Sequence, residues 1–535
     1  AITDIPNNRF NAKELYTENP DESGKITLKQ GGFLNDIDKF DGSFFDISYT
    51  ELENLDPQQR LGLEVTYEAL ENAGLDVKKL VDSDTSVFAG ITNIDYQSKS
   101  FRTGDFTSIN HYSYSGQALC ANSGRISYLL GLQGPSVTID TACSSSLVAT
   151  DMAVKSLRNN DSSLSIVTAC NLILDPELTI YFSHLNALSK NSRCKSFSNE
   201  GNGFVRSEGC ATIILKRLSD AQRDGDNVLA IIKGTAVNQD GKSNGFTAPS
   251  VSAQKKLLIT ALKNARLNPS QIDYIEAHGT GTKIGDPIEM DAISAVFKSG
   301  RSKENPLLIG SVKTNFGHTE AVAGLAGLIK VILALENKKI PKNLHFETPN
   351  ELIDWQNLPF KVPTTNTNWD NAEKNAGVSG FGVTGTNAHV ILSNPPLVER
   401  EKPALRNDFY ALPLSAKSEE SLKGLVNRYI DFLKVSTNSL EEICAMAALK
   451  RTHWEYRIVF VAKTKAELIE QLSDFTQVEY EPKNVFDEDA EPNIVFVFPG
   501  QGAQWIGMGK QLFESELIFK ESIIASRDAF KKWVD

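Results

Sequence analysis

The sequence contains few cysteines and no long apolar run. Its 535 residues include six cysteines, and no two of them have the spacing of a CxxC pair. This density excludes a disulfide-stabilised secreted scaffold and favours a reducing compartment. No stretch reaches the ~18 consecutive apolar residues of a membrane-spanning helix, and no signal-peptide pattern is evident. We therefore expect a cytoplasmic protein without a membrane partner.

Positive charge is also scarce. The chain has 55 Lys and Arg residues against 67 Asp and Glu residues, which gives a net charge of −12. This balance disfavours nucleic acid or an anionic surface as the main partner. The hydrophobic share of 41% is ordinary for a globular protein. Because the length exceeds that of a usual single domain, we expect one large unit and at least one smaller one.

One cysteine lies in a distinctive local context. A short β-branched run at 137–139 predicts a strand, and apolar residues from 147 to 157 recur at helical spacing. Cys143 is therefore expected where a strand turns sharply into a helix N-terminus. Free backbone N–H groups and the positive helix end favour a thiolate there. Although most free cysteines are small core residues, we predict that Cys143 is a nucleophile with a thiol pKa of ~3.5–7.5.

Strand and helix patterns alternate through most of the first 395 residues. The predicted strands lie at 85–90, 165–169, 211–215, 228–232, 273–277 and 307–311, and the predicted helices at 57–73, 117–130, 253–265 and 321–335. This alternation predicts a layered α/β domain.

A Pro-Pro pair at 395–396 and a charged run after it predict a domain boundary. Beyond the boundary, strands at 410–414 and 458–461 and helices at 419–433 and 440–449 predict a small α/β unit, and a further strand is expected at 494–498. We therefore divide the chain into residues 1–395, 396–492 and 493–535.

Two histidines follow predicted strands directly. His278 lies just past the strand at 273–277, and Lys313 and His318 follow the strand at 307–311. Glycines beside them allow close backbone approach. Singly, each histidine is as easily structural as catalytic, but together they favour acid–base or hydrogen-bond chemistry.

A third glycine-rich turn contains Gly380, Gly382 and Gly385, which match G-x-G-x-x-G by letter. A dinucleotide site needs a helix next, whereas residues 388–392 have a strand pattern, so we reject that interpretation. Zinc held by Cys143, His278 and His318 lacks any local ligand spacing, so no metal is expected.

These motifs resemble those of β-ketoacyl synthases. Asp140–Ser146, Glu276–Glu289 and Gly310–His318 are similar to the family's Cys, His and Lys-His motifs. Leu55–Arg60 resembles the type I polyketide synthase version in particular. The resemblance covers residues 1–395.

The resemblance implies a thiolase fold, which is a five-layer α/β/α/β/α sandwich, and a homodimer. It implies an acyltransferase of the β-ketoacyl synthase type, in which Cys143 takes an acyl group from the phosphopantetheine arm of an acyl carrier protein. That arm is part of the substrate and not a bound cofactor. His278 and His318 would stabilise the enolate formed by decarboxylation of a malonyl-type extender, and Lys313 would support them electrostatically.

Further site residues are implied in the same way. The backbone N–H groups of Cys143 and Phe381 would form the oxyanion hole, and the hydroxyls of Thr280 and Thr282 would meet the pantetheine arm. Residues 396–492 resemble a linker to an acyltransferase, and residues 496–504 resemble the start of that neighbouring domain. Its Gly-His-Ser-x-Gly motif does not follow, so we assign no acyltransferase-domain activity here. We also expect the family's first central strand to be missing.

Two rival functions stay open. A cysteine acyl-thioester hydrolase would use Cys143 and one histidine, but it leaves the other histidine and Lys313 without a role. A non-catalytic scaffold or docking fragment would not need Cys143 and both histidines.

Overall fold

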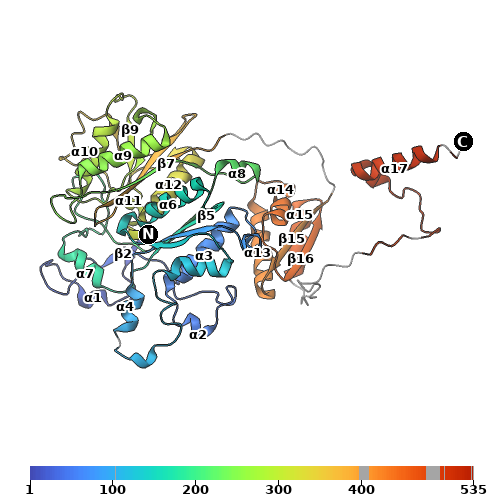
Figure 1. Ribbon diagram of the computed structural model, residues 1–535, viewed down its shortest axis with the longest axis horizontal. Coiled ribbons are helices and arrows are strands. Elements are labelled where there is room, and N and C mark those ends of the chain that lie inside the picture. Colours follow the sequence, from blue (N-terminus) through green and yellow to red (C-terminus); the bar gives the residue numbers. More distant parts are fainter. Residues whose placement is uncertain (103, 397–408, 477–494, 499, 532, 534–535) are drawn as a thin grey trace. The chain divides into compact units, whose positions relative to one another are not determined.

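The computed structural model describes residues 1–102, 104–396, 409–476, 495–498, 500–531 and 533 (Figure 1). The chain divides into two units, residues 1–396 and 397–535. The first unit contains two β-sheets, and each sheet carries a different part of the candidate site.

The first sheet has four strands. Their order is β4 (Ser136–Ile139), β3 (Ser86–Gly90), β5 (Leu164–Asn171) and β6 (Gly209–Lys216). β3 is parallel to β4 and β5, and β6 is antiparallel to β5. β3 and β5 are buried along their whole length, as expected for strands covered on both faces. β4 lies at the edge and is partly exposed.

The second sheet has six strands. Their order is β11 (Phe360–Lys361), β9 (Leu307–Gly310), β8 (Tyr274–Glu276), β13 (Asn375–Phe381), β14 (Thr386–Ser393) and β7 (Ile231–Gln239). The first four are parallel neighbours, whereas β14 is antiparallel to both β13 and β7.

Two helices lie between the sheets. α6 (Ser145–Asn159) contacts β3 and β5 on one side and β14 and β7 on the other, and α12 (Ala323–Asn337) packs on β13 and on α6. The outer faces are covered by α3 (Pro57–Asn72) and α5 (Ala121–Leu130) on the first sheet, and by α9 (Val251–Ala265) with α10 (Gly285–Phe297) on the second. Figure 1 shows α6 and α12 in the middle of this unit. The predicted five-layer α/β/α/β/α sandwich is confirmed.

The central layer fits between the sheets because α6 presents small and branched side chains to both. Ala149 and Ala153 pack with Phe88 and Val167 of the first sheet. Leu147, from the same helix, joins a cluster with residues of β13 and β14. Since all of these side chains are buried, apolar burial holds both sheets on one helix.

Short elements complete the first unit. Its other strands are β1 (Ile2–Asp4), β2 (Gln30–Gly32), β10 (Lys339–Ile340) and β12 (Thr367–Asn368). Its other helices are α1 (Ala12–Leu15), α2 (Tyr49–Leu52), α4 (Asp95–Phe101), α7 (Glu177–His184), α8 (Leu218–Arg223) and α11 (Lys313–Phe316). Single 3₁₀ turns lie at Val77–Leu80, Phe106–Ser108, Ala142–Ser144, Pro269–Gln271 and Glu320–Val322.

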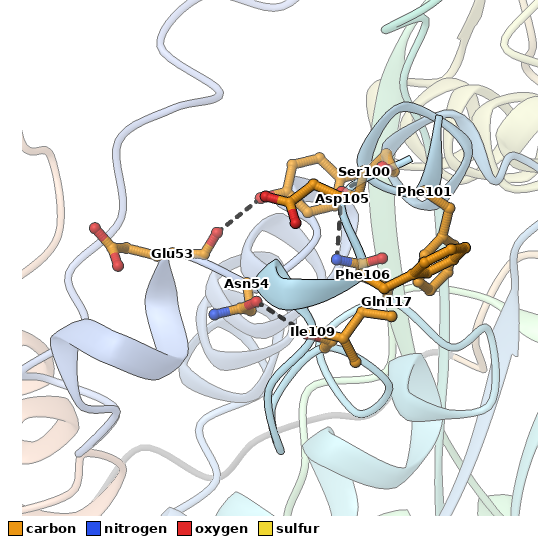
Figure 2. A pocket seen from close by; sticks show the side chains of 10 residues that line it. Glu53, Asn54, Ser100, Phe101, Asp105, Phe106, Ile109 and Gln117 are labelled. Atoms are coloured by element: carbon orange, nitrogen blue, oxygen red, sulfur yellow. Dashed lines mark hydrogen bonds between the residues drawn. The ribbon is translucent and has the colours of Figure 1, made fainter. Parts of the chain in front are cut away.

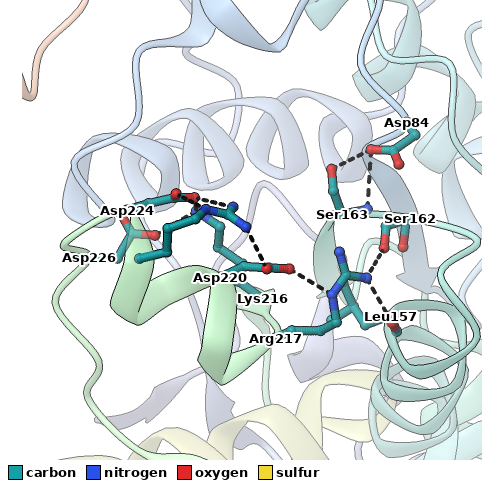
Figure 3. A network of polar contacts seen from close by, with 10 residues as sticks. Asp84, Leu157, Ser162, Ser163, Lys216, Arg217, Asp220, Asp224 and Asp226 are labelled. Atoms are coloured by element: carbon teal, nitrogen blue, oxygen red, sulfur yellow. Dashed lines mark hydrogen bonds and ion pairs between the residues drawn. The ribbon is translucent and has the colours of Figure 1, made fainter.

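A polar network fastens the end of β6 and the start of α8 to the end of α6 (Figure 3). Arg217 donates to the carbonyls of Leu157 and Ser162, at 2.9 Å each, and to the carboxylate of Asp220 at 2.6 Å. Lys216 contacts Asp226 at 2.7 Å. Arg217 thus joins the last turn of α6 to the loop that follows it.

Two predicted elements have different bounds. The helix expected at 117–130 begins at Ala121, because the N–H groups of Gln117 and Ala118 donate to the carbonyl of Tyr114 and belong to the preceding turn. The strand expected at 228–232 lies later, as β7 (Ile231–Gln239), because its pairing with β14 extends to Gln239. In both cases the neighbouring backbone, rather than the local pattern, determines where the element starts.

The second unit has a two-stranded antiparallel sheet, β15 (Tyr410–Ala416) with β16 (Tyr456–Ala462). Three helices share a buried apolar core with it: α13 (Glu419–Val435), α14 (Leu440–Leu449) and α15 (Lys465–Thr476). α14 begins where predicted, because Ser439 and Glu442 form a capping box.

Residues near the C-terminus form α16 (Lys510–Ser515) and α17 (Leu517–Phe530). The strand predicted at 494–498 is wrong for the residues that are described, because 495–498 are irregular and exposed. A run of apolar residues forms a strand only where another strand pairs with it. Over all described residues, no helix has the length and apolar character to cross a bilayer.

Candidate active site

Cys143 lies on the predicted turn between a strand and a helix. β4 ends at Ile139, the 3₁₀ turn Ala142–Ser144 follows, and α6 begins at Ser145. Ala142 has a φ of +54°, a value that costs free energy for a residue with a Cβ. Such strain is typical of a backbone that holds a functional group in a fixed position.

Side chains from within the turn stabilise it. The hydroxyl of Ser145 accepts the N–H of Thr141 at 2.9 Å and donates to the carbonyl of Ala142 at 2.7 Å. The carboxylate of Asp140 accepts the N–H of Ala142 at 2.9 Å. The geometry around the cysteine is therefore fixed by residues close to it in sequence.

The thiol of Cys143 has a high pKa. Burial, followed by the negative charge of Glu320, raises it to about 12, against the lowering effect of Lys313 and of the backbone N–H groups of Cys143 and Val383. The expectation of a pKa between ~3.5 and 7.5 is therefore wrong for this site. The helix end does favour a thiolate, but desolvation in the folded chain outweighs it. The thiol is protonated at neutral pH.

His278 follows β8 and is held by a carboxylate of α10. Glu289 accepts the backbone N–H of His278 at 2.8 Å and that of Gly279 at 2.9 Å. Asp286, at the start of the same helix, accepts the N–H of Gly281 at 3.1 Å. Burial raises the pKa of Glu289 to about 7 and that of Asp286 to about 6. The loop that carries His278 is thus anchored through its backbone.

His318 follows α11 and is bridged to the segment around Arg206. Its N–H donates to the carbonyl of Val205 at 2.7 Å, and its carbonyl accepts the N–H of Ser207 at 2.9 Å. Its side chain is buried and packs edge-on against Phe204, with ring centroids 5.2 Å apart. The backbone of this histidine is therefore fixed on both sides.

The two imidazoles have matching hydrogen bonds. Nδ1 of His278 accepts the N–H of Phe381 at 3.3 Å, and Nδ1 of His318 accepts the N–H of Glu320 at 3.0 Å. The ring centroids are 5.5 Å apart. Burial, followed by the positive charge of Lys313, holds both pKa values well below the ordinary 6.5. Both rings are therefore neutral, and these bonds assign the proton to Nε2 in each ring.

Lys313 is buried close to these groups. Burial lowers its pKa, while the charge of Glu276 and a thiolate at Cys143 would raise it. Its positive charge in turn lowers the pKa of Cys143, His278 and His318. This lysine therefore affects all three groups electrostatically, which is the role that the resemblance implies for it.

Phe381 ends β13 and contacts His278. Its ring centroid is 5.4 Å from that of His278. Because its N–H already donates to His278, it would have to share or leave that bond to serve in an oxyanion hole. A Cβ added to the next residue, Gly382, would lie 2.3 Å from the carbonyl oxygen of Thr141, so this turn packs directly on the turn that carries Cys143.

The glycine-rich run from Gly380 to Gly385 leads into β14, so the strand predicted at 388–392 is confirmed. A dinucleotide site would need a helix N-terminus at this point of the chain, where the strand lies instead. Among the described residues, no group of three or more His, Cys, Asp or Glu side chains is arranged to hold a metal ion.

Thr280 and Thr282 lie in the loop after His278. Their hydroxyl oxygens are 3.2 Å apart, and that of Thr282 also accepts the N–H of Gly285 at 3.2 Å. Thr280 is buried and Thr282 is half-buried, next to the exposed Lys283. Exposure therefore increases along this loop from Thr280 to Lys283.

Sequence reasoning missed Arg206 and Glu320. Arg206 and Glu320 form a buried bidentate ion pair beside His318, with distances of 2.5 and 3.1 Å. The two residues are far apart in the sequence, so no local pattern could have paired them. Asp286 and Glu289 lie in a segment that the resemblance covers, but their hydrogen bonds to the histidine loop were not foreseen.

A separate cavity of about 230 Å³ lies beside α2 and α4 (Figure 2). Tyr96 donates to the carbonyl of Glu53 at 3.0 Å, and Gln117 donates to Ser100 at 3.3 Å. Its lining consists of Glu53, Asn54, Tyr96, Ser100, Phe101, Asp105, Phe106, Ile109, Ser113 and Gln117. This lining includes none of the predicted site residues.

Four known protein families match successive parts of the chain. A model of the β-ketoacyl synthase N-terminal domain matches residues 1–221, and one of the β-ketoacyl synthase C-terminal domain matches residues 229–347. The ketoacyl-synthetase C-terminal extension matches residues 349–461, and the acyl transferase domain matches residues 495–535.

Among full sequences, the chain is 43% identical over 538 residues to a component of the phenolphthiocerol/phthiocerol polyketide synthase of Mycobacterium tuberculosis. It is 39% identical over 545 residues to erythronolide synthase EryA2 of Saccharopolyspora erythraea. These matches cover 99% and 100% of the chain, but the chain spans only 28% and 15% of the two relatives.

Among solved structures, the chain resembles the ketosynthase from module 6 of the bacillaene synthase of Bacillus subtilis 168. The TM-score is 0.81 and the identity 34%, over 97% of this chain and 85% of that one. An oxazolomycin ketosynthase domain of Streptomyces albus JA3453 gives a TM-score of 0.82 at 33% identity, over 89% and 83% of the two chains.

Proposed function

Because the chain belongs to the β-ketoacyl synthase family, in its type I polyketide synthase branch, we propose that Cys143, His278 and His318 carry out its decarboxylative condensation. The substrates are an acyl group on Cys143 and a malonyl-type extender on the phosphopantetheine arm of an acyl carrier protein. The observation that carries this proposal is the pair of neutral imidazoles, each with Nδ1 bound to a backbone N–H and Nε2 left to donate.

The first step transfers the acyl group to Cys143. The sulfur attacks the thioester carbonyl, the bond to the pantetheine sulfur breaks, and the thiol proton leaves with the departing sulfur. The backbone N–H groups of Cys143 and Val383 and the charge of Lys313 all lower the pKa of the thiol, so they favour the attacking form. This acyl transfer would place the protein among the acyltransferases of class EC 2.3.1.

The second step forms the new carbon–carbon bond. The extender loses CO₂, and the electron pair left behind forms an enolate whose oxygen accepts both Nε2–H bonds. The enolate carbon attacks the acyl carbon on Cys143, the C–S bond breaks, and the released thiolate takes a proton from water. Removing one such donor typically costs ~10²–10³ in rate. Burial, followed by the charge of Lys313, lowers the pKa of both rings, so that Nδ1 stays free to accept its backbone N–H and Nε2 carries the proton.

Three contacts complete the proposal. The N–H groups of Cys143 and Phe381 hold the oxygen of the tetrahedral intermediate, with Phe381 shifting from His278 as that charge develops. The hydroxyls of Thr280 and Thr282 meet the pantetheine arm on its way to the histidines. No other cofactor is required for these steps.

The proposal extends to the neighbouring parts of the chain. Residues 1–395 form the ketosynthase domain, 396–492 the linker and 493–535 the start of an acyltransferase domain that acts as a partner. A homodimer is supported by β4, an edge strand whose Ser136 and Val137 are exposed and open to pairing.

Intact-mass analysis tests the function. The chain is incubated with a short acyl-pantetheine thioester, and the Cys143→Ala variant serves as the control. We expect one acyl adduct on the wild type and none on the variant, and release of a β-ketoacyl product after addition of malonyl carrier protein.

The same assay separates the rivals. A hydrolase would lose its adduct to water without malonyl carrier protein, and a scaffold would form no adduct although folded. Either result would overturn the proposal. His278→Ala and His318→Ala are expected to keep the adduct but lose condensation.

A further inference from the structure

A buried ion pair lies directly beside His318. The backbone of His318 pairs with residues 205 and 207, on either side of Arg206. The guanidinium of Arg206 then reaches the carboxylate of Glu320, two residues after the histidine, at 2.5 and 3.1 Å. Arg206 is 2% exposed and Glu320 is 7% exposed. His318 is therefore connected to Arg206 twice, through backbone pairing and through the ion pair with Glu320.

The backbone at Glu320 is strained. Its φ is +50°, a conformation that L-residues avoid unless their surroundings impose it. This conformation accompanies the placement of the Glu320 N–H on Nδ1 of His318 at 3.0 Å. The ion pair with Arg206 offsets the strain, because a bidentate charged hydrogen bond is among the strongest that a buried side chain can form.

Arg206 is itself held in place. It donates to the hydroxyl of Thr179 at 2.8 Å, and its guanidinium lies 5.7 Å from the ring centroid of Phe182. Phe182 packs edge-on against Phe204, which packs edge-on against His318. The arginine is therefore connected to the histidine through packing as well as through Glu320.

We propose that Arg206 and Glu320 form a positioning pair for His318, which keeps the Glu320 N–H on Nδ1 and so keeps Nε2 as the protonated, donating nitrogen. The inference deepens the proposed function and rests on it for the use of that donor. Neither residue contacts the reacting atoms in this role. They act through the orientation and tautomer of the imidazole.

The charges of the pair also affect the pKa of Cys143 and of His318. The charge of Glu320 raises the pKa of the Cys143 thiol, and that of Arg206 lowers the pKa of His318. Removing the charge of Glu320 therefore favours the thiolate while it loosens the histidine. A residue that only stabilised the fold would not move these two properties in opposite directions.

The chain offers a matched control in the ion pair of Arg9 and Glu208. It is equally buried and bidentate, with distances of 2.8 and 3.0 Å. Its carboxylate accepts the N–H groups of Leu34 and Ile173 and contacts no histidine. Glu208→Gln therefore disturbs a buried ion pair that includes neither Glu320 nor the N–H group bound to Nδ1 of His318.

The experiment compares Glu320→Gln with Glu208→Gln in the full chain. A second variant, the double change Arg206→Met with Glu320→Leu, keeps a similar side-chain volume and removes both charges of the pair, so it is expected to fold. The readouts are thermal unfolding, ¹⁵N shifts of the His318 ring, alkylation of Cys143 by iodoacetamide at pH 8, and CO₂ release from malonyl-pantetheine.

For Glu320→Gln we expect a mixture of His318 tautomers, faster alkylation, and CO₂ release lowered about 10–100-fold, by analogy with the loss when a partner that orients a metal-bound histidine is changed. The double variant should show the same tautomer mixture and loss of CO₂ release. Glu208→Gln should lower only the unfolding temperature.

Wild-type tautomer and CO₂ release in both Glu320→Gln and the double variant would overturn the positioning role. The ring shifts and the alkylation rate do not depend on condensation. If His318 responds to Glu320 while the wild type forms no acyl adduct, the pair stands and the proposed function fails.

Discussion

The two sheets of the first unit support their parts of the site in different ways. After β4, the nucleophile Cys143 is fixed by Asp140, Thr141 and Ser145, all within three residues of it. After β8 and β9, the two histidines are fixed by groups from other segments, such as Glu289 for His278. The position of the nucleophile is therefore a local property, whereas the positions of the donors depend on tertiary contacts.

The nucleophile and the two histidines should therefore be sensitive to substitutions at different positions of the chain. Changes near Cys143 in sequence should alter the nucleophile, whereas the donors should respond to changes at distant positions. Tertiary contacts can also override local ones, because burial, followed by the charge of Glu320, raises the pKa of Cys143 against the effect of its own helix end.

Gly382→Ala should have the largest effect. It changes the turn after β13, which packs on the turn that carries Cys143. The added Cβ would lie 2.3 Å from the carbonyl oxygen of Thr141, so one backbone must shift. A displacement of about 1 Å in a catalytic group can cost ~10²-fold in rate. We expect the rate of acyl-adduct formation at Cys143 to fall by about that factor. An unchanged rate would show that the turn at Cys143 is independent of β13.

Glu289→Gln should remove a distant support of His278. A glutamine offers one acceptor oxygen where the carboxylate accepts two N–H groups. We expect CO₂ release from malonyl-pantetheine to fall about 10–100-fold, while acylation of Cys143 changes little. Loss of acylation to the same extent would mean that Cys143 and the histidines are not supported independently.

The same variant has a pH signature. Burial raises the pKa of Glu289 from 4.5 to about 7, so the folded state holds this proton more tightly than the unfolded state. Its contribution to stability is therefore largest below about pH 4.5 and is lost as pH rises through 7. The unfolding temperature of the wild type should exceed that of Glu289→Gln by more at pH 5 than at pH 8. The opposite trend would contradict a raised pKa.

The pH dependence of Cys143 alkylation tests whether burial or the helix end dominates the pKa of the thiol. With a thiol pKa of about 12, the thiolate fraction is small and the iodoacetamide rate should rise about tenfold per pH unit between pH 7 and 9. A rate that is flat over this range would mean that the helix end prevails over burial. Peptide mapping distinguishes this site from the exposed Cys120.

Gly62→Ala should produce the smallest effect and serves as the control for Gly382→Ala. Gly62 lies inside α3, and an added Cβ would meet no atom within 4 Å. Replacing a helical glycine by alanine typically stabilises by ~0.5–1 kcal/mol. We expect a slightly higher unfolding temperature with unchanged acylation. Lower activity would show that substitution of any glycine disturbs this fold.

Helix starts that depend on a capping residue next to them in the sequence were predicted correctly. α3 begins at Pro57, where Asp56 caps the helix, and α14 spans the predicted residues because of its capping box. The starts of β7 and α5 were misplaced, because pairing with β14 and turns near Tyr114 determine them. The strand predicted at 494–498 failed for residues 495–498, which are irregular.

The sequence by itself determined the types of chemical group in this protein. Its motifs identified the family, the cysteine on the turn, and the histidines and lysine after strand ends. These features follow from short-range backbone geometry, which a dozen neighbouring residues specify.

Only the tertiary structure decided the states of those groups. It set the tautomer of His278 through the N–H group of the distant Phe381, and it raised the pKa of the thiol. It also paired Arg206 with Glu320. These outcomes depend on desolvation and on charges from distant segments, and both arise only when the two sheets close on the same buried space.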